Sequence, residues 1–81
     1  MKPEIVLKMK EQFKSEIVAY AGYEALLKMV DDSYLEEALS EIMYDEYVHA
    51  KFLRSYMMEA GVYDPAQYED CEKAYKKMMG D

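Results

Sequence analysis

The sequence predicts an all-α protein, an antiparallel two-helix hairpin followed by a short third helix. Proline occurs only at positions 3 and 65 and glycine only at 22, 61 and 80. The long stretches between them are rich in Glu, Lys, Ala, Leu and Met, which favour helix. Apolar residues recur at alternating steps of three and four, as on one face of a helix, and not at every second position as in a strand.

The first helix is expected from about Pro3 to about Met29, because proline suits the first helical turn. Glu16 is the only charged residue in its apolar stripe. Gly22, in the middle of the helix, either lets a neighbouring helix approach closely or is a tolerated weak point. The stripe consists of Val6, Met9, Phe13, Glu16, Tyr20, Tyr23, Leu27 and Val30.

The second helix is expected from about Tyr34 to Ala60. Ser33 followed by Glu36 is typical of a capping box at a helix start, and Gly61 is a natural stop. The connection is short, so the two helices should be antiparallel neighbours. The second stripe consists of Leu35, Leu39, Ile42, Glu46, His49, Leu53, Tyr56, Met57 and Ala60.

A third helix is expected after Asp64, which would be its N-cap, with Pro65 as its first residue and Gln67 as the reciprocal capping partner. It would run to about Met79 and pack on its own hairpin or on another subunit. With 81 residues the chain is one small domain. Residues 1–62 would form the hairpin, and residues 63–81 would add the third helix to it.

Composition excludes several classes of function. The formal net charge of −7 argues against binding to nucleic acid or to an anionic membrane surface. The single cysteine, Cys71, cannot form an intrachain disulfide or a four-cysteine metal site, and it is expected to be a small apolar filler. The sequence shows no signal peptide and no apolar stretch that spans a bilayer, so we expect a cytoplasmic protein.

The polar residues that interrupt the two apolar stripes should lie close together in the hairpin. Glu46 and His49 are three residues apart and therefore share one helical face. Glu16 lies roughly 15 residues before the turn and the other two roughly 15 to 18 after it, so all three sit about 22–26 Å from the turn. Burying them without partners would cost several kcal/mol per charge, and a cation would offset that cost. Carboxylate and imidazole together suit iron, manganese or zinc better than calcium or magnesium.

One hairpin leaves its apolar seams partly uncovered, and large apolar patches mark interfaces. Two hairpins related by a twofold axis would form a four-helix bundle. Such a dimer would bring together a lone Glu from each of two helices and a Glu-x-x-His from each of the other two. This donor set is typical of dinuclear carboxylate bundles.

Two segments carry a resemblance to a known family. Glu16 followed seven residues later by Tyr23, and the block Asp-Glu-Tyr-Val-His-Ala at 45–50, resemble half of a ferritin-like domain of the rubrerythrin group. The layout is similar to that of encapsulated ferritins, in which hairpins dimerise around a di-iron site. The resemblance covers roughly residues 9–60. It implies a ferritin-like bundle with two irons per dimer, one glutamate bridging them, and Glu16, Glu46 and His49 as ligands and catalytic residues.

The resemblance also implies that Tyr23 hydrogen-bonds to the ligands. Asp45 is expected to be solvent-exposed or to act as an outer group near them. Ser15 and Val18 flank Glu16, so the acidic cluster through which iron reaches encapsulated ferritins looks missing. Residues 77–81 show no evident cargo tail, which argues against encapsulation in a protein shell. The chain also lacks a rubredoxin part, which argues against peroxide reduction with a built-in electron supply.

Three functions are compatible with these features. The first is oxidation of Fe(II) by oxygen or peroxide, for iron storage or detoxification, in a homodimer or a multiple of dimers. The second is a helical assembly module held together by zinc, manganese or calcium, without turnover. The third is a metal-free helical interaction module.

Overall fold

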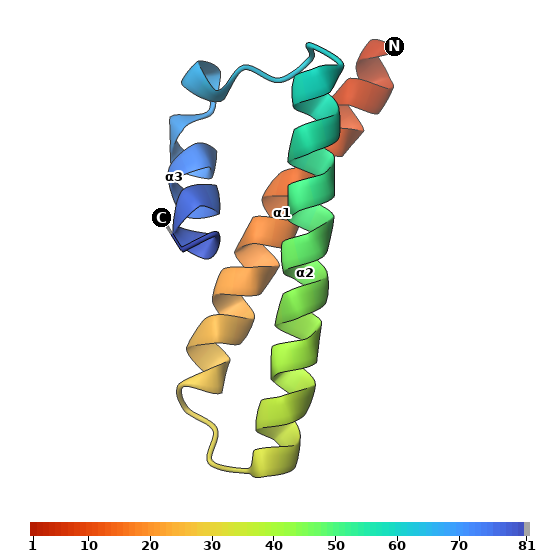
Figure 1. Cartoon of the computed structure of the whole chain (residues 1–81). Coiled ribbons are helices and arrows are strands. Elements are labelled where there is room, and N and C mark those ends of the chain that lie inside the picture. The colour runs from red at the N-terminus through yellow and green to blue at the C-terminus, as the bar shows by residue number, and fades with distance from the viewer. Residues whose placement is uncertain (81) are drawn as a thin grey trace.

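The computed structural model describes residues 1–80 and is helical almost throughout. It contains α1 (Pro3–Leu27), α2 (Ser33–Glu59), a short 3₁₀ helix η1 (Pro65–Gln67) and α3 (Glu69–Met78). Figure 1 shows α1 and α2 as long antiparallel neighbours joined by a short turn. No strand occurs in the described part of the chain, so the all-α prediction is confirmed. The predicted third segment and tail extend to Asp81, which lies outside the described residues.

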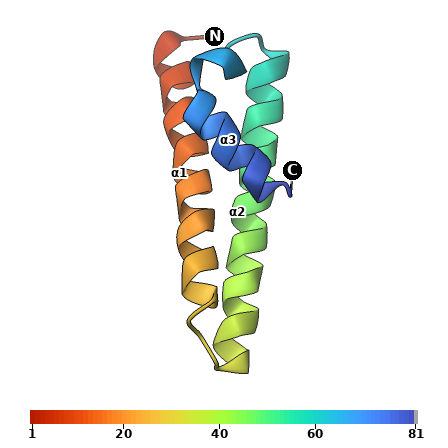
Figure 2. The same ribbon diagram turned by 90° about the vertical axis from the view of Figure 1, so that its left-hand side faces the viewer.

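The third helix packs on its own hairpin. Figures 1 and 2 show α3 lying over the half of the hairpin farthest from the turn. Phe13 of α1 is almost completely buried there and meets Tyr63 edge to face, with ring centroids 5.6 Å apart. Cys71 is half-buried against this core, and burial raises the pKa of its thiol, as expected of an apolar filler. The core consists of Phe13, Ile17, Ala50, Met57, Tyr63, Tyr75 and Met78.

A buried ion pair joins α3 to α2. Arg54 donates from Nε to Glu72 Oε1 at 2.7 Å and from Nη2 to Oε2 at 2.9 Å. The buried Tyr63 hydroxyl donates to Glu72 Oε1 at 2.8 Å, and the Arg54 guanidinium lies 4.8 Å from the centre of the Tyr75 ring. Glu72 is therefore buried with both of its oxygens hydrogen-bonded, which fixes α3 against α2.

The capping residue of α2 differs from the prediction by one position. Asp32, not Ser33, is the N-cap, and its carboxylate accepts from the backbone N–H groups of Tyr34 and Leu35 at 2.9 and 3.1 Å. Ser33 is the first helical residue, so the predicted capping box is wrong. A carboxylate at this point satisfies two free N–H groups and interacts favourably with the helix dipole, which a serine hydroxyl does less well.

The predicted start of the third helix is also wrong. Asp64 does accept from the backbone N–H of Ala66 at 3.0 Å, but it caps only the 3₁₀ helix η1. Tyr68 leaves the helical conformation, with φ −131° and ψ 50°, and its ring stacks on Tyr63 at 5.2 Å. Tyr68 therefore separates η1 from α3, which begins at Glu69.

The predicted stop of the second helix is confirmed. Gly61 adopts φ 69°, which a residue with a Cβ rarely adopts. The N–H of Val62 donates to the carbonyl of Met57 at 3.0 Å, and that of Gly61 donates to the carbonyl of Met58 at 3.1 Å. These two bonds form a Schellman motif, which turns the chain toward α3.

The apolar stripe predicted for the first helix is buried or half-buried at every position, whereas that of the second helix divides between two sides. The side of α2 that faces α1 is centred on Ala50, which is fully buried and was not in the predicted stripe. Leu39 and Met57 are buried on that side, but Leu35, Ile42, His49 and Tyr56 remain exposed. The small side chain of Ala50 is thus enclosed completely at the contact with α1.

Five of the exposed apolar residues lie on a surface on the side away from α3. On α2, Arg54 contacts α3. His49 lies five residues before Arg54, which is about 140° around the helix, and therefore points to a different side. On α1, Ile17 lines the groove under α3, and Gln12 lies five residues before it, again about 140° around the helix. The apolar members of this surface are 37% to 48% exposed. We call it the bare face, and it consists of Ile5, Gln12, Leu26, Leu35, Ile42, His49 and Tyr56.

Gly22 is a weak point in α1. A Cβ built at this position would meet nothing within 4 Å, so close approach of a neighbour does not explain the glycine. We expect Gly22→Ala to raise the free energy of unfolding by about 1 kcal/mol, because alanine loses less backbone entropy in a helix. The thermal midpoint, followed by circular dichroism, should rise by about 4–8 °C. An unchanged or lower midpoint would contradict this.

Candidate metal centre

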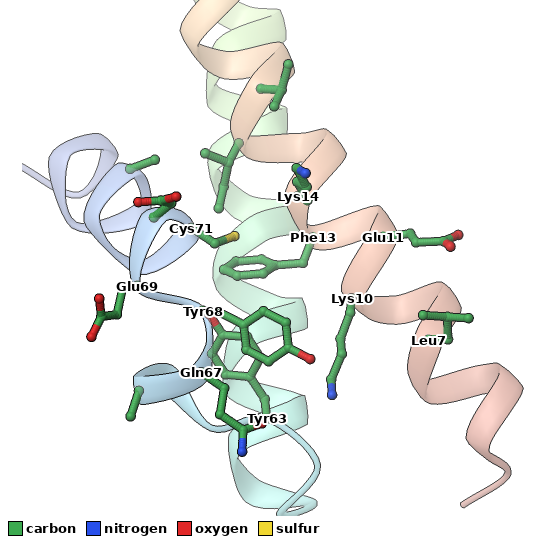
Figure 3. Close-up of a pocket in the computed structure, with 15 residues that line it drawn as sticks. Leu7, Lys10, Glu11, Phe13, Lys14, Tyr63, Gln67, Tyr68, Glu69 and Cys71 are labelled. Carbon is green, nitrogen blue, oxygen red and sulfur yellow. The ribbon is translucent and has the colours of Figure 1, made fainter.

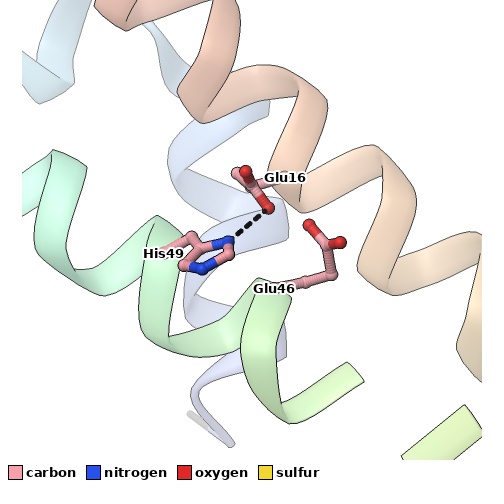
Figure 4. Close-up of side chains that lie close together, drawn as sticks. All are labelled: Glu16, Glu46 and His49. Carbon is pink, nitrogen blue, oxygen red and sulfur yellow. Dashed lines mark ion pairs between the residues drawn. The ribbon is translucent and has the colours of Figure 1, made fainter. Parts of the chain in front are cut away.

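The three polar residues predicted to meet do come together. Glu16 lies on α1, and Glu46 and His49 lie one turn apart on α2. One donor atom from each side chain lies within 4.8 Å of the donor atoms of the other two. Figure 4 shows the three side chains pointing toward one another across the gap between the helices. Among residues 1–80 this is the only group of three or more His, Cys, Asp and Glu side chains with such a spacing.

The three residues lie at nearly the same distance from the turn along the hairpin because that turn is short. Residues 28–32 connect the helices directly, so positions equally far from the turn lie beside each other. The three-residue spacing on α2 then places Glu46 and His49 on adjacent turns of one face. The predicted proximity of the three residues is therefore confirmed, while metal coordination by them stays a prediction.

Burial decreases across the cluster. Glu16 is buried, Glu46 is half-buried and His49 is exposed. His49 Nδ1 lies 3.5 Å from Glu16 Oε2, a contact drawn as a dashed line in Figure 4. The cluster is thus anchored between the helices on α1 and opens toward solvent at His49, a member of the bare face.

The two oxygens of Glu16 have different surroundings. Oε1 accepts a hydrogen bond from Gln12 Nε2 at 2.9 Å. Oε2 is fully buried and accepts no hydrogen bond from any residue between 1 and 80. A buried carboxylate oxygen without a donor costs free energy, and a cation held with Glu46 and His49 would remove that cost. The donor set of two carboxylates and one imidazole therefore fits a transition-metal ion.

The other predicted residues lie near the cluster without joining it. Tyr23 is half-buried one heptad after Glu16, and no hydrogen bond within the described range 1–80 connects it to the cluster. Asp45 is exposed, in agreement with the first of its two expected placements. The roles of Tyr23 as a hydrogen-bond partner and of Asp45 as an outer group stay predictions.

Sequence reasoning missed Gln12. It lies one turn before Glu16 on α1, at the four-residue spacing at which helical side chains interact. That spacing was visible in the sequence, but an exposed glutamine carries no charge and interrupts no buried stripe. Its importance becomes clear only from the buried Glu16 oxygen beside it.

A separate groove lies away from this cluster. It has a volume of about 890 Å³ and runs between α1 and the η1–α3 segment. Figure 3 shows Phe13, Tyr63, Tyr68 and Cys71 along it, with Lys10 at its edge. Lys10 Nζ lies 5.0 Å from the centre of the Tyr68 ring. The charged side chains around this groove are of both signs and do not converge, so the groove does not share the chemistry of the Glu16 cluster.

No helix in the part of the chain described, residues 1–80, combines the length and the apolar character needed to cross a bilayer. Comparisons of the chain with protein families, with curated proteins and with solved structures find no match.

Proposed function

We propose that this protein is a ferritin-like iron-binding protein that oxidises Fe(II) at a site shared by two copies of the chain. The observation that carries the proposal is the buried Oε2 of Glu16, which accepts no hydrogen bond within residues 1–80 and lies within reach of the donor atoms of Glu46 and His49. This is a paired-carboxylate and imidazole donor set between two antiparallel helices. The sequence resemblance to the rubrerythrin group and the encapsulated ferritins supports the same function.

Each residue would have a distinct task. Glu16 and Glu46 would bind Fe(II) and neutralise its charge, and the product Fe(III), being more highly charged, would be held more strongly by the same oxygens. His49 would fix the position of the ion and tune its redox potential. Two Fe(II) ions would lose one electron each, and dioxygen would accept both electrons with two protons to become hydrogen peroxide.

A second copy would complete the site. Three donors from one chain leave further coordination positions open for a transition-metal ion. His49 is exposed and lies on the bare face, between Ile42 and Tyr56 of the same helix. A partner chain that covers this surface would remove its exposed apolar side chains from water and would bring a second Glu16, Glu46 and His49 close to the first set. Manganese or zinc would suit the same donors.

We expect the metal-free protein to take up about one Fe(II) per chain without oxygen, in a dimer or a multiple of dimers. Air should then produce oxygen uptake in proportion to the bound iron. Glu46→Ala should abolish both, because it removes a carboxylate donor from each copy. Glu41→Ala, an exposed glutamate five residues earlier on α2, is the matched control and should behave like the wild type. Iron content, oxygen consumption and oligomer size would be measured on the same samples.

The outcomes separate the proposed function from its alternatives. Binding without oxygen uptake, together with a metal-dependent rise in the thermal midpoint, would replace the oxidase with a metal-held assembly module. No saturable binding of iron, manganese or zinc would leave a metal-free helical module. Binding that Glu46→Ala does not alter would place iron at a different site.

A further inference from the structure

The hydrogen bond between Gln12 and Glu16 divides the Glu16 carboxylate into two unequal oxygens. A carboxylate only accepts hydrogen bonds, so the Gln12 group in contact with it must be the amide NH₂, at 2.9 Å. This bond occupies Oε1. The other oxygen, Oε2, is the one that lies 3.5 Å from His49 Nδ1 and has no hydrogen bond of its own within residues 1–80.

This contact also limits how the Glu16 side chain can turn. A glutamate has three side-chain torsions, and the last of them rotates over a broad range. The backbones of residues 12 and 16 are fixed one turn apart on α1, so a bond between their side chains restricts the plane of the carboxylate. Oε2 is thereby kept aimed at the space between Glu46 and His49, which Figure 4 shows facing it.

We propose that Gln12 is a positioning residue for the metal site: it holds Glu16 Oε1, so that Glu16 presents the single oxygen Oε2 to the cation. The inference rests on the proposed metal-binding function and adds to it a residue outside the ligand set. Outer partners that orient a ligand in this way affect metal affinity by about ten- to a hundredfold. Gln12 acts through Glu16 and does not itself touch the ion.

Gln12 can be replaced without disturbing the fold. It is exposed, at the edge of the bare face, and its neighbours in the core do not depend on its amide. Gln12→Met keeps the length and the helix propensity of the side chain but removes the donor. Gln67→Met, at the only other glutamine of the chain, is the matched control, because Gln67 lies in η1 and is also exposed.

The test uses Co(II) as the probe, because it accepts the same oxygen and nitrogen donors and its visible absorption reports the geometry of its ligands. We expect Gln12→Met to weaken Co(II) binding about ten- to a hundredfold and to change the shape of the absorption bands. The thermal midpoint of the metal-free variant should equal that of the wild type. Gln67→Met should leave affinity and spectrum unchanged.

The possible failures are distinguishable. If wild-type protein binds Co(II) and Glu46→Ala does not, but Gln12→Met matches the wild type in affinity and spectrum, the positioning role is overturned and the metal site stands. If the wild type shows no saturable Co(II) binding, the metal site itself is overturned, and the role of Gln12 with it. A weaker affinity with an unchanged spectrum and a lowered metal-free midpoint would assign Gln12 a structural role only.

Discussion

Replacing Arg54 by Met is expected to lower the free energy of unfolding by about 3 kcal/mol, because it leaves the Glu72 carboxylate buried without its cation. The Glu72 side chain is only 9% exposed, and two of its three described hydrogen bonds come from Arg54. The Arg54 side chain is 23% exposed, which places the effect at the lower end of the range for buried pairs. Urea unfolding followed by circular dichroism measures it.

The matched control is Lys51→Met, which removes an exposed cation from the same helix. It should change the free energy of unfolding by no more than about 0.5 kcal/mol. The double variant Arg54→Met/Glu72→Met should recover much of the lost stability, because neither partner is then left charged and buried. Equal stabilities of Arg54→Met and Lys51→Met would show that the ion pair contributes nothing.

The same pair gives a pH dependence with a definite sign. Hydrogen bonding to Arg54, and then to Tyr63, holds the pKa of Glu72 below its ordinary value. A carboxyl group whose pKa is lowered by folding stabilises the protein above its unfolded pKa of about 4.3, and this stabilisation is lost as the pH falls through the folded pKa. The stability difference between wild type and Arg54→Met should therefore be full near neutral pH and should shrink under acidic conditions.

The second large effect concerns assembly. If two copies pair through the bare face, Ile42→Asp should convert the oligomer into a folded monomer, because it introduces a charge on each copy into a surface that must lose water. Like charges brought together at an interface cost several kcal/mol, so the dissociation constant should rise at least about a hundredfold. Fe(II) uptake should fall with it at concentrations where the variant is monomeric. Sedimentation equilibrium over a range of protein concentrations measures this.

Val18→Asp provides the control for that experiment. Val18 is also an aliphatic residue with an exposed side chain, but it borders the groove between α1 and α3 and lies outside the bare face. It should assemble like the wild type. A wild-type chain that remains monomeric while binding iron would contradict assembly through the bare face, and so would an Ile42→Asp variant that still forms dimers.

Much of this arrangement could be predicted from the sequence. The alternating steps of three and four between apolar residues predicted the helices, and the short connection at 28–32 predicted that the two long helices are antiparallel neighbours. Because an α-helix rises by a constant amount per residue, the distances of Glu16, Glu46 and His49 from that connection were enough to predict their meeting. The stop at Gly61 followed from the backbone freedom of glycine.

Other features depend on packing that no local pattern encodes. The partners Arg54 and Glu72 are 18 residues apart, and the side of the hairpin on which α3 packs is set by the course of the chain through η1. The position of Ala50 at the centre of the helix contact depends on how α1 and α2 pack. A heptad pattern identifies a broad apolar face of a helix. Only the fold shows which residues of that face are buried within one chain and which remain exposed.

The position of α3 also affects how assemblies of this protein would grow. Helix α3 covers one side of the hairpin over the half with the core, so the two broad sides of each chain are different. When the bare faces of two copies pair, each copy uses the same surface. Neither copy then has a bare face left to bind a third chain. Such a contact is complete with two chains, whereas a contact between unlike sides would form a ring if its rotation closes and an open filament if it does not. By occupying one side, α3 would favour the closed pair over an open filament.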